Sequence, residues 1–247
     1  MPYAEQTVTS IRRWSDRTFS FMTTRPDAFD FKNGEFVMLG LRADGKLIPR
    51  AYSIVSTNRD DYLEFLSIQV PDGPLTSRLA QVDKGNSIWI NTKTTGSLTL
   101  DHILPGRHLY MLATGTGLAP FISLIRAGEV FQSFERVVLV HTVRKAHGLA
   151  YREELISRTG DDFLYVPTVT REQFDTTDRG ADLFRCGELT DRLDLPLPDP
   201  EHDRVMLCGN PTMNTEMTQY LKQHGWTLTN YKGAGNLAVE QAFVLEK

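Results

Sequence analysis

Cysteine is scarce in this chain of 247 residues, which holds only Cys186 and Cys208. Two cysteines cannot build a disulfide framework or ligate an iron–sulfur cluster, so the reducing cytoplasm is the expected location. No apolar stretch approaches the ~20 residues of a membrane span. The opening residues, MPYAEQTVTSIRRW, lack the apolar segment of a signal peptide. We therefore expect no membrane partner.

Positive charge is not in excess either, since the formal net charge is −4 and no basic run or basic–aromatic platform occurs. A nucleic-acid partner is therefore not expected. The six histidines show no helical metal-ligand spacing, and neither a Ser/His/Asp order nor a carboxylate pair stands out. We expect no metal site. A monomer is the default expectation.

The first part of the chain is a series of short alternating segments separated by turn signals such as Asn33-Gly34 and Lys84-Gly85. Many short strands in this pattern predict a closed antiparallel barrel or sandwich. A helix is expected at Leu75–Val82. The predicted strands are Gln6–Ile11, Thr18–Thr23, Phe36–Leu41, Arg50–Ser56, Tyr62–Val70 and Ser87–Ile90.

From about Pro105 strand and helix patterns alternate, which predicts βαβ units, a parallel sheet and helices on both faces. The expected strands are His108–Ala113, Arg136–His141, Phe163–Thr168, Arg204–Leu207 and Leu237–Val244, and the expected helices are Ala119–Phe131, Gly148–Ser157, Glu188–Leu193 and Pro211–His224. The expected fold is thus an N-terminal antiparallel β-barrel domain, residues 1–103, followed by a nucleotide-binding α/β domain, residues 104–247.

The stretch MLATGTGLAPF, residues 111–121, joins an apolar strand to a helix through a glycine turn. This order aims backbone N–H groups at a phosphate, although G-x-G after a strand can also be a purely structural turn. Pro120 stands where the third glycine of the ordinary dinucleotide fingerprint would be, and proline suits the first turn of a helix. Cys208 and Gly209 end a later parallel strand and should flank the same crevice.

Six motifs make the interpretation specific: RAYS at 50–53, GPLTSRL at 73–79, ATGTGLAP at 113–120, VTRE at 169–172, LCGNPTM at 207–213 and the terminal AFVLEK at 242–247. Their kind and order resemble the bacterial ferredoxin/flavodoxin–NADP(H) reductases over the whole chain. The resemblance implies that the barrel binds FAD, that the α/β domain binds NADP(H), and that the C-terminal tail closes over the FAD.

The resemblance places Arg50 at the FAD pyrophosphate, Tyr52 stacked on the isoalloxazine ring and Ser53 at the flavin N5 edge. An ordinary strand is the alternative. The helix after Gly73 offers free N–H groups and hydroxyls to the pyrophosphate, with simple capping by Thr or Ser as the alternative. Ala242 is expected against the flavin and Phe243 on its adenine, or else in the core. The full FAD set is Arg50, Ala51, Tyr52, Ser53, Ile68, Val70, Gly73, Leu75, Thr76, Ser77, Ala242 and Phe243.

The resemblance likewise implies that the glycine turn of ATGTGLAP binds the pyrophosphate of NADP(H) and that Thr116 lies beside the nicotinamide. Cys208 is either a residue shaping the hydride path or a buried small hydrophobe; no base beside it would make it a nucleophile. Cys186 is assigned to packing. The catalytic set is Ser53, Thr116 and Cys208. The NADP set is Thr114, Gly115, Thr116, Gly117, Arg144, Arg171, Arg179, Cys208 and Gly209.

Selectivity for NADP(H) should come from arginines that follow the second and third strands of the α/β domain, Arg144 and Arg171. The family pattern expects a third arginine after a glycine, but here the order is Arg179-Gly180. Arg179 either reaches the 2′-phosphate from a shifted position or is solvated.

The resemblance implies a ferredoxin/flavodoxin–NADP(+) reductase, in which hydride exchange between NADPH C4 and flavin N5 is coupled to one-electron exchange with ferredoxin or flavodoxin. One alternative is an NADH-using reductase component of an oxygenase or other redox system. Another is a non-enzymatic binding module, against which the intact motifs argue.

Overall fold

The computed structural model describes residues 3–230 and 233–241. Contacts between Cα atoms divide the chain into two units, Met1–Gly96 with Ala119–Ala127, and Ser97–Leu118 with Gly128–Lys247. Each unit has a sheet and a hydrophobic core of its own. Within the described ranges, no helix combines the length and the hydropathy needed to cross a membrane.

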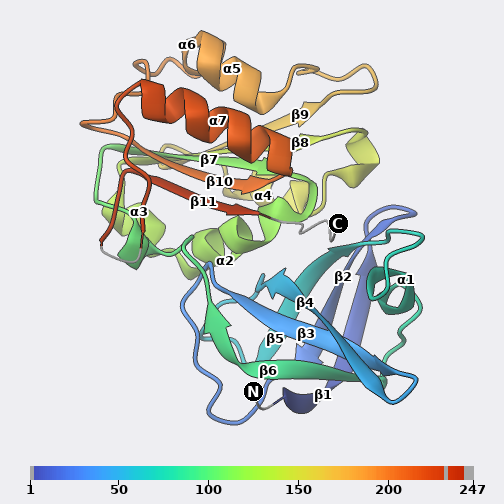
Figure 1. Ribbon diagram of the computed structural model, residues 1–247. Helices are drawn as coiled ribbons and strands as arrows, with labels where there is room; N and C mark the ends of the chain where they lie inside the picture. Colours follow the sequence, from blue (N-terminus) through green and yellow to red (C-terminus); the bar gives the residue numbers. More distant parts are fainter. Residues whose placement is uncertain (1–2, 231–232, 242–247) are drawn as a thin grey trace. The chain divides into compact units, whose positions relative to one another are not determined.

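The first unit is built on a six-stranded sheet of order β4-β3-β6-β1-β2-β5, whose neighbouring strands all pair antiparallel (Figure 1). Its strands are β1 Tyr3–Arg13, β2 Thr18–Thr24, β3 Phe36–Ala43, β4 Lys46–Ser53, β5 Tyr62–Ile68 and β6 Ser87–Thr95. A bridge from Ile54, just after β4, to Phe65 in β5 brings the two edge strands together. The expected antiparallel barrel is confirmed.

Alternation of side chains explains the core of this unit. In β2, Phe19 and Phe21 are buried, and in β5 and β6 Phe65 and Ile88 join them. The predicted helix is present as α1, Thr76–Leu79, although it is shorter than expected. β4 begins earlier than predicted because residues 44 and 45 form a tight turn with φ of 51° and 75°, which pairs the whole of β3 with β4.

The helix α2, Ala119–Ala127, groups with the first unit through polar contacts. The Ser123 hydroxyl donates to the Ser56 carbonyl at 2.8 Å. Arg126 forms a 2.6 Å ion pair with Glu64, whose side chain is almost wholly buried. These contacts come in addition to seven consecutive buried residues, 119–125.

The second unit has a five-stranded parallel sheet of order β11-β10-β7-β8-β9 (Figure 1). Its strands are β7 His108–Thr114, β8 Arg136–Val143, β9 Phe163–Val169, β10 Arg204–Gly209 and β11 Leu237–Gln241. Its helices are α3 Val130–Ser133, α4 Arg152–Arg158, α5 Gly180–Cys186, α6 Glu188–Arg192 and α7 Pro211–Gln223, with 3-10 turns at Leu100–His102, Gly115–Leu118 and Ala146–Gly148. The parallel α/β prediction is confirmed.

Both faces of this sheet are covered. Helices α5, α6 and α7 share one core with alternate residues of β7, β8 and β10, and they lie together over one face in Figure 1. On the other face Phe131 of α3 contacts Phe163 of β9, with ring centroids 6.0 Å apart. Burial on both faces explains why β7 is a continuous apolar run rather than an alternating one.

Several of the helix boundaries expected after Pro105 were wrong. The helix predicted over Ala119–Phe131 ends at Ala127, because the chain turns at Gly128 with φ of 82° before α3 begins. The helix predicted from Gly148 begins only at Arg152, since Tyr151 adopts a left-handed φ of 58°. Helix α5 was not predicted. Its last residue, Cys186, is exposed, so its assignment to packing was wrong as well.

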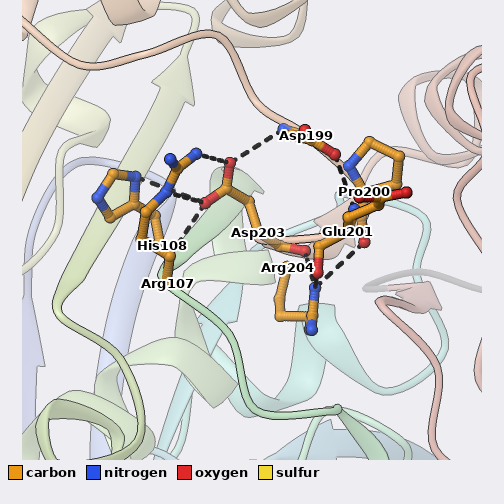
Figure 2. A network of polar contacts seen from close by, with 7 residues as sticks. All are labelled: Arg107, His108, Asp199, Pro200, Glu201, Asp203 and Arg204. Atoms are coloured by element: carbon orange, nitrogen blue, oxygen red, sulfur yellow. Dashed lines mark hydrogen bonds and ion pairs between the residues drawn. The ribbon is translucent and has the colours of Figure 1, made fainter.

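A buried polar network joins the starts of β7 and β10 (Figure 2). The Asp203 carboxylate is fully buried and accepts from Arg107 Nε at 3.0 Å and Nη2 at 2.7 Å. The amides of His108 and Asp199 donate to it at 3.2 and 2.9 Å. Beside it, Arg204 donates to the carbonyls of its own loop and of residues 104 and 105. The network fixes the edge of the sheet that lies opposite the carboxyl ends of the strands.

Candidate functional site

The RAYS segment forms the carboxyl end of β4 in the first unit. Tyr52 is buried; its hydroxyl lies 3.0 Å from Ser67 Oγ, and its ring meets Phe21 and Phe65 edge-on. Burial raises the pKa of Tyr52 to about 12, so its hydroxyl stays protonated. Ala51 is exposed, and Arg50 and Ser53 are half-buried. The strand end therefore offers a cation and a hydroxyl beside a fixed aromatic ring.

The segment 70–77 of the first unit folds back on itself through hydroxyl groups. Thr76 Oγ1 lies 3.3 Å from both the amide and the carbonyl of Val70, and Ser77 Oγ donates to the Gly73 carbonyl at 2.7 Å. The residue that precedes α1 is Leu75 and no side chain caps the helix, so simple capping by Thr or Ser was wrong.

This segment leaves donors for an anion. Among the described residues, no acceptor is recorded for the backbone amides of Leu75 and Thr76. Ile68, the last residue of β5, is half-buried, and Val70, two residues further on, is 44% exposed. Unused amides, together with the Arg50 guanidinium, are the donor set that a pyrophosphate requires, so the residues of this unit fit FAD.

In the second unit, the carboxyl ends of β7 and β10 meet at the point where the strand order reverses. Thr114 Oγ1 accepts from the Asn210 amide at 2.7 Å. The turn Gly115–Leu118 lies directly on the end of β10, because a Cβ on Gly117 would come within 2.8 Å of Gly209 Cα. These contacts bring the glycine turn, Thr114 and Gly209 together, as the sequence predicted. Such a switch point is where parallel sheets bind ligands.

Cys208 lies inside this edge of the sheet and is fully buried between Ala113 and Glu240 of the flanking strands. Burial, and to a lesser extent Glu240, raises the pKa of the Cys208 thiol well above its ordinary value. A raised pKa favours the protonated thiol, which is a weak nucleophile. Its complete burial fits the packing interpretation, and a contact with nicotinamide stays a prediction. Thr116 is half-buried in the turn.

Three exposed arginines gather at the carboxyl edge of β8 and β9. Arg144 directly follows β8 and Arg171 is the second residue after β9, and the Arg171 amide donates to the Arg144 carbonyl at 2.9 Å. Arg179 precedes α5, where the Gly180 amide donates to Thr142 Oγ1 at 3.1 Å, two residues before Arg144. In the described part of the chain, none of the three guanidinium groups has a recorded side-chain hydrogen bond or ion pair. They are available to an anion.

Sequence reasoning missed the residues that hold these loops, namely Thr142 and Asn210. Asn210 caps α7 by accepting from the Thr212 amide at 2.8 Å. The N-P dipeptide before a helix was the available signal for that cap. Ala242, Phe243 and the rest of the tail lie outside the described residues. Within 3–230 and 233–241, no cluster of three or more metal-ligating side chains is found.

Comparison with known proteins adds independent findings. The sequence model of the oxidoreductase FAD-binding domain matches residues 6–98, and that of the oxidoreductase NAD-binding domain matches residues 111–219. The chain is 44% identical to a ferredoxin–NADP reductase of Azotobacter vinelandii, over 96% of each chain. It is 42% identical to a flavodoxin/ferredoxin–NADP reductase of Rhodobacter capsulatus, over 98% of this chain and 93% of the other. A crystal structure of a ferredoxin NADP+ reductase from Neisseria gonorrhoeae with bound FAD and NADP is 30% identical, with a TM-score of 0.92 over 98% of this chain and 99% of that one.

Proposed function

The chain belongs to the family of bacterial ferredoxin/flavodoxin–NADP reductases, and from this membership we propose that it exchanges electrons between NADP(H) and a small one-electron carrier. It is an FAD- and NADP-dependent oxidoreductase, and the resemblance drawn from the six motifs is confirmed. When bound, FAD supplies the exchange between hydride and single electrons. The observation that carries the proposal is that the chain holds two sets of hydrogen-bond donors to phosphates, one suited to a flavin and one to a dinucleotide, and that its relatives are ferredoxin–NADP reductases.

For the FAD site we propose the residues that the motifs assign. Arg50 and the amides of residues 75 and 76 hold the pyrophosphate, Tyr52 packs against the ring system and Ser53 presents a hydroxyl to N5. The fixed Tyr52 ring supports these roles, and so do the two amides, which have no backbone acceptor in the described part of the chain. The described part of the proposed site is completed by Ala51, Ile68, Val70, Gly73 and Ser77, and Ala242 and Phe243 are proposed from the motif alone.

For the NADP site we propose that the turn Gly115–Leu118 binds the pyrophosphate and that Thr116 orients the nicotinamide. Arg144, Arg171 and Arg179 are proposed to bind the 2′-phosphate, Arg179 from its shifted position. The hydrogen bond from Gly180 to Thr142 supports this, because it holds the start of α5 at the same strand edge as Arg144. Cys208 is proposed to lie beneath the nicotinamide.

The proposed ligand-binding domains are residues 1–103 for FAD and 104–247 for NADP(H), and both family matches fall within these ranges. The proposed partners are ferredoxin and flavodoxin, the electron carriers after which the relatives are named. We further propose that the protein acts as a cytoplasmic monomer. Sedimentation analysis would test the oligomeric state.

An anaerobic absorbance titration of the purified protein tests the proposal directly. We expect a flavin band that bleaches at low NADPH concentration and much more slowly with NADH. Equal bleaching by both nucleotides would favour the NADH-using reductase component instead. If no flavin band formed after FAD addition, the enzymatic function would be refuted.

A further inference from the structure

A buried histidine lies beneath the glycine turn of the second unit. His141, near the end of β8, is fully buried, and its Nε2 lies 3.1 Å from the carbonyl oxygen of Gly115. Its Nδ1 lies 3.4 Å from the hydroxyl of Tyr165 in β9. The register pairs Leu139 with Tyr165 and His141 with Pro167, so the two side chains share one face of the sheet as diagonal neighbours.

The direction of these hydrogen bonds follows from their partners. A carbonyl oxygen can only accept, so Nε2 of His141 carries the hydrogen and donates to Gly115. Nδ1 is then the acceptor, and the Tyr165 hydroxyl donates to it. Burial lowers the pKa of His141 to about 4 and raises the pKa of Tyr165, so both groups are neutral near pH 7. The chain of donors therefore runs one way, from Tyr165 through His141 to the turn.

The carbonyl that His141 holds belongs to the residue on which the turn depends. Gly115 has φ of 55°, and a Cβ placed on it would find nothing within 4 Å, so the space around it is open. In a planar trans peptide the C=O and the following N–H point in opposite directions. A Gly115 carbonyl held against the sheet therefore turns the Thr116 amide away from it. No acceptor is recorded for that amide among the described residues.

We propose that His141, positioned by Tyr165, sets the orientation of the Gly115–Thr116 peptide so that its N–H group binds the pyrophosphate of NADP(H). Both are positioning residues, since neither touches the nucleotide. The inference rests on the proposed function, but it concerns one phosphate group only. The 2′-phosphate site at Arg144 and Arg171 does not depend on it.

The test uses two near-isosteric variants in the FAD-loaded protein. In His141→Gln the side-chain amide can still donate to Gly115 from the place of Nε2, whereas in His141→Asn the amide reaches only the place of Nδ1. The ligands are NADP+ and 2′-AMP, which carries the 2′-phosphate but no pyrophosphate. Their dissociation constants are measured by calorimetry. His108→Asn is the matched control, because His108 is a buried histidine at the opposite edge of the same sheet.

We expect His141→Asn to weaken NADP+ binding about tenfold or more, and His141→Gln to stay within about threefold of the unsubstituted protein. Binding of 2′-AMP should stay within about twofold in both variants, and His108→Asn should alter neither ligand. Equal effects of the Asn and Gln variants, or equal weakening of both ligands, would overturn the inference and leave His141 a packing residue.

Tyr165→Phe is a milder variant that removes only the donor to Nδ1. It should weaken NADP+ binding about threefold without changing 2′-AMP binding, and no change in NADP+ binding would remove Tyr165 from the assignment. If the unsubstituted protein bound neither ligand, the proposed function would fail. That result differs from every outcome that would overturn the role of His141.

Discussion

The buried carboxylate of Asp203 offers a test of how this unit is held together. Asp203→Asn keeps the shape of the side chain but replaces one carboxylate oxygen with an NH2 group. Each oxygen accepts two hydrogen bonds, Oδ1 from Arg107 Nε and the His108 amide, and Oδ2 from Arg107 Nη2 and the Asp199 amide. Whichever way the new amide turns, two donors face an NH2 group and lose their acceptor (Figure 2).

The magnitude follows from this count. A stranded buried donor costs about 1–3 kcal/mol, and the Arg107 guanidinium also loses its charged partner. We expect the free energy of unfolding to fall by about 3–5 kcal/mol, measured by urea denaturation with circular dichroism. Asp162→Asn is the matched control, because that carboxylate is 44% exposed and its ion pair with Arg158 spans 3.4 Å. The control should change stability by less than about 0.5 kcal/mol.

The Asp203 network lies at the opposite edge of the sheet from the proposed nucleotide site. The KM for NADPH should therefore be unchanged in Asp203→Asn below the unfolding transition. A loss of less than about 1 kcal/mol would refute the hydrogen-bond reasoning, and so would an equal loss in the Asp162 control.

Further predictions concern the nucleotide site. Arg144→Ala should raise the KM for NADPH at least about tenfold and leave the KM for NADH unchanged, because a charged phosphate contact is worth ~1.5–3 kcal/mol. The control is Lys222→Ala, a substitution in the last turn of α7. Equal effects of Arg144→Ala on both nucleotides would exclude a role at the 2′-phosphate. Gly117→Ala should weaken NADP+ binding about tenfold while FAD absorbance persists, since the new Cβ would press on Cys208 and Gly209; unchanged binding would show that the turn moves freely. Acid should destabilise the second unit, because the pKa of His141 is about 4 in the fold against 6.5 when exposed. As the pH falls, the unfolded chain therefore takes up the proton before the folded chain does. The free energy of unfolding should be highest above about pH 6.5 and should fall by about 3 kcal/mol towards pH 4. Urea titrations should show a smaller loss in His141→Gln, and an equal loss in that variant would contradict the assignment to His141.

Local pattern was enough to predict most of the architecture. The run HLYMLA was expected as a strand and is the central strand β7, because burial on both faces demands continuous apolar residues. The glycine turn and the strand-end arginines were also predicted, since parallel strands end at one edge. The family motifs predicted which segments supply the hydrogen-bond donors to the phosphates, although a motif carries no information on distances.

What the sequence could not predict depends on partners that are distant in the chain. Helix α5 was missed because its two buried residues, Leu183 and Phe184, pack against β7 and β8, and these strands are distant in the sequence. The position of His141 beneath the turn could not be predicted, because its partners Gly115 and Tyr165 are identified only by the registers of β7, β8 and β9. The grouping of α2 with the first unit likewise rests on pairs such as Arg126 and Glu64.

The place of α2 has a consequence for the order of events during synthesis. A nascent chain that ends at Gly96 carries all six strands of the first unit but not the Ser123 and Arg126 side chains that pair with Ser56 and Glu64. At ~5–20 residues per second, α2 follows a few seconds later, after β7 has already been made. The first unit, which includes α2, therefore cannot be completed before synthesis of the second unit has begun. A fragment that stops at Gly96 should be less stable than the same unit within the whole chain, because the buried Glu64 carboxylate would lose the Arg126 guanidinium.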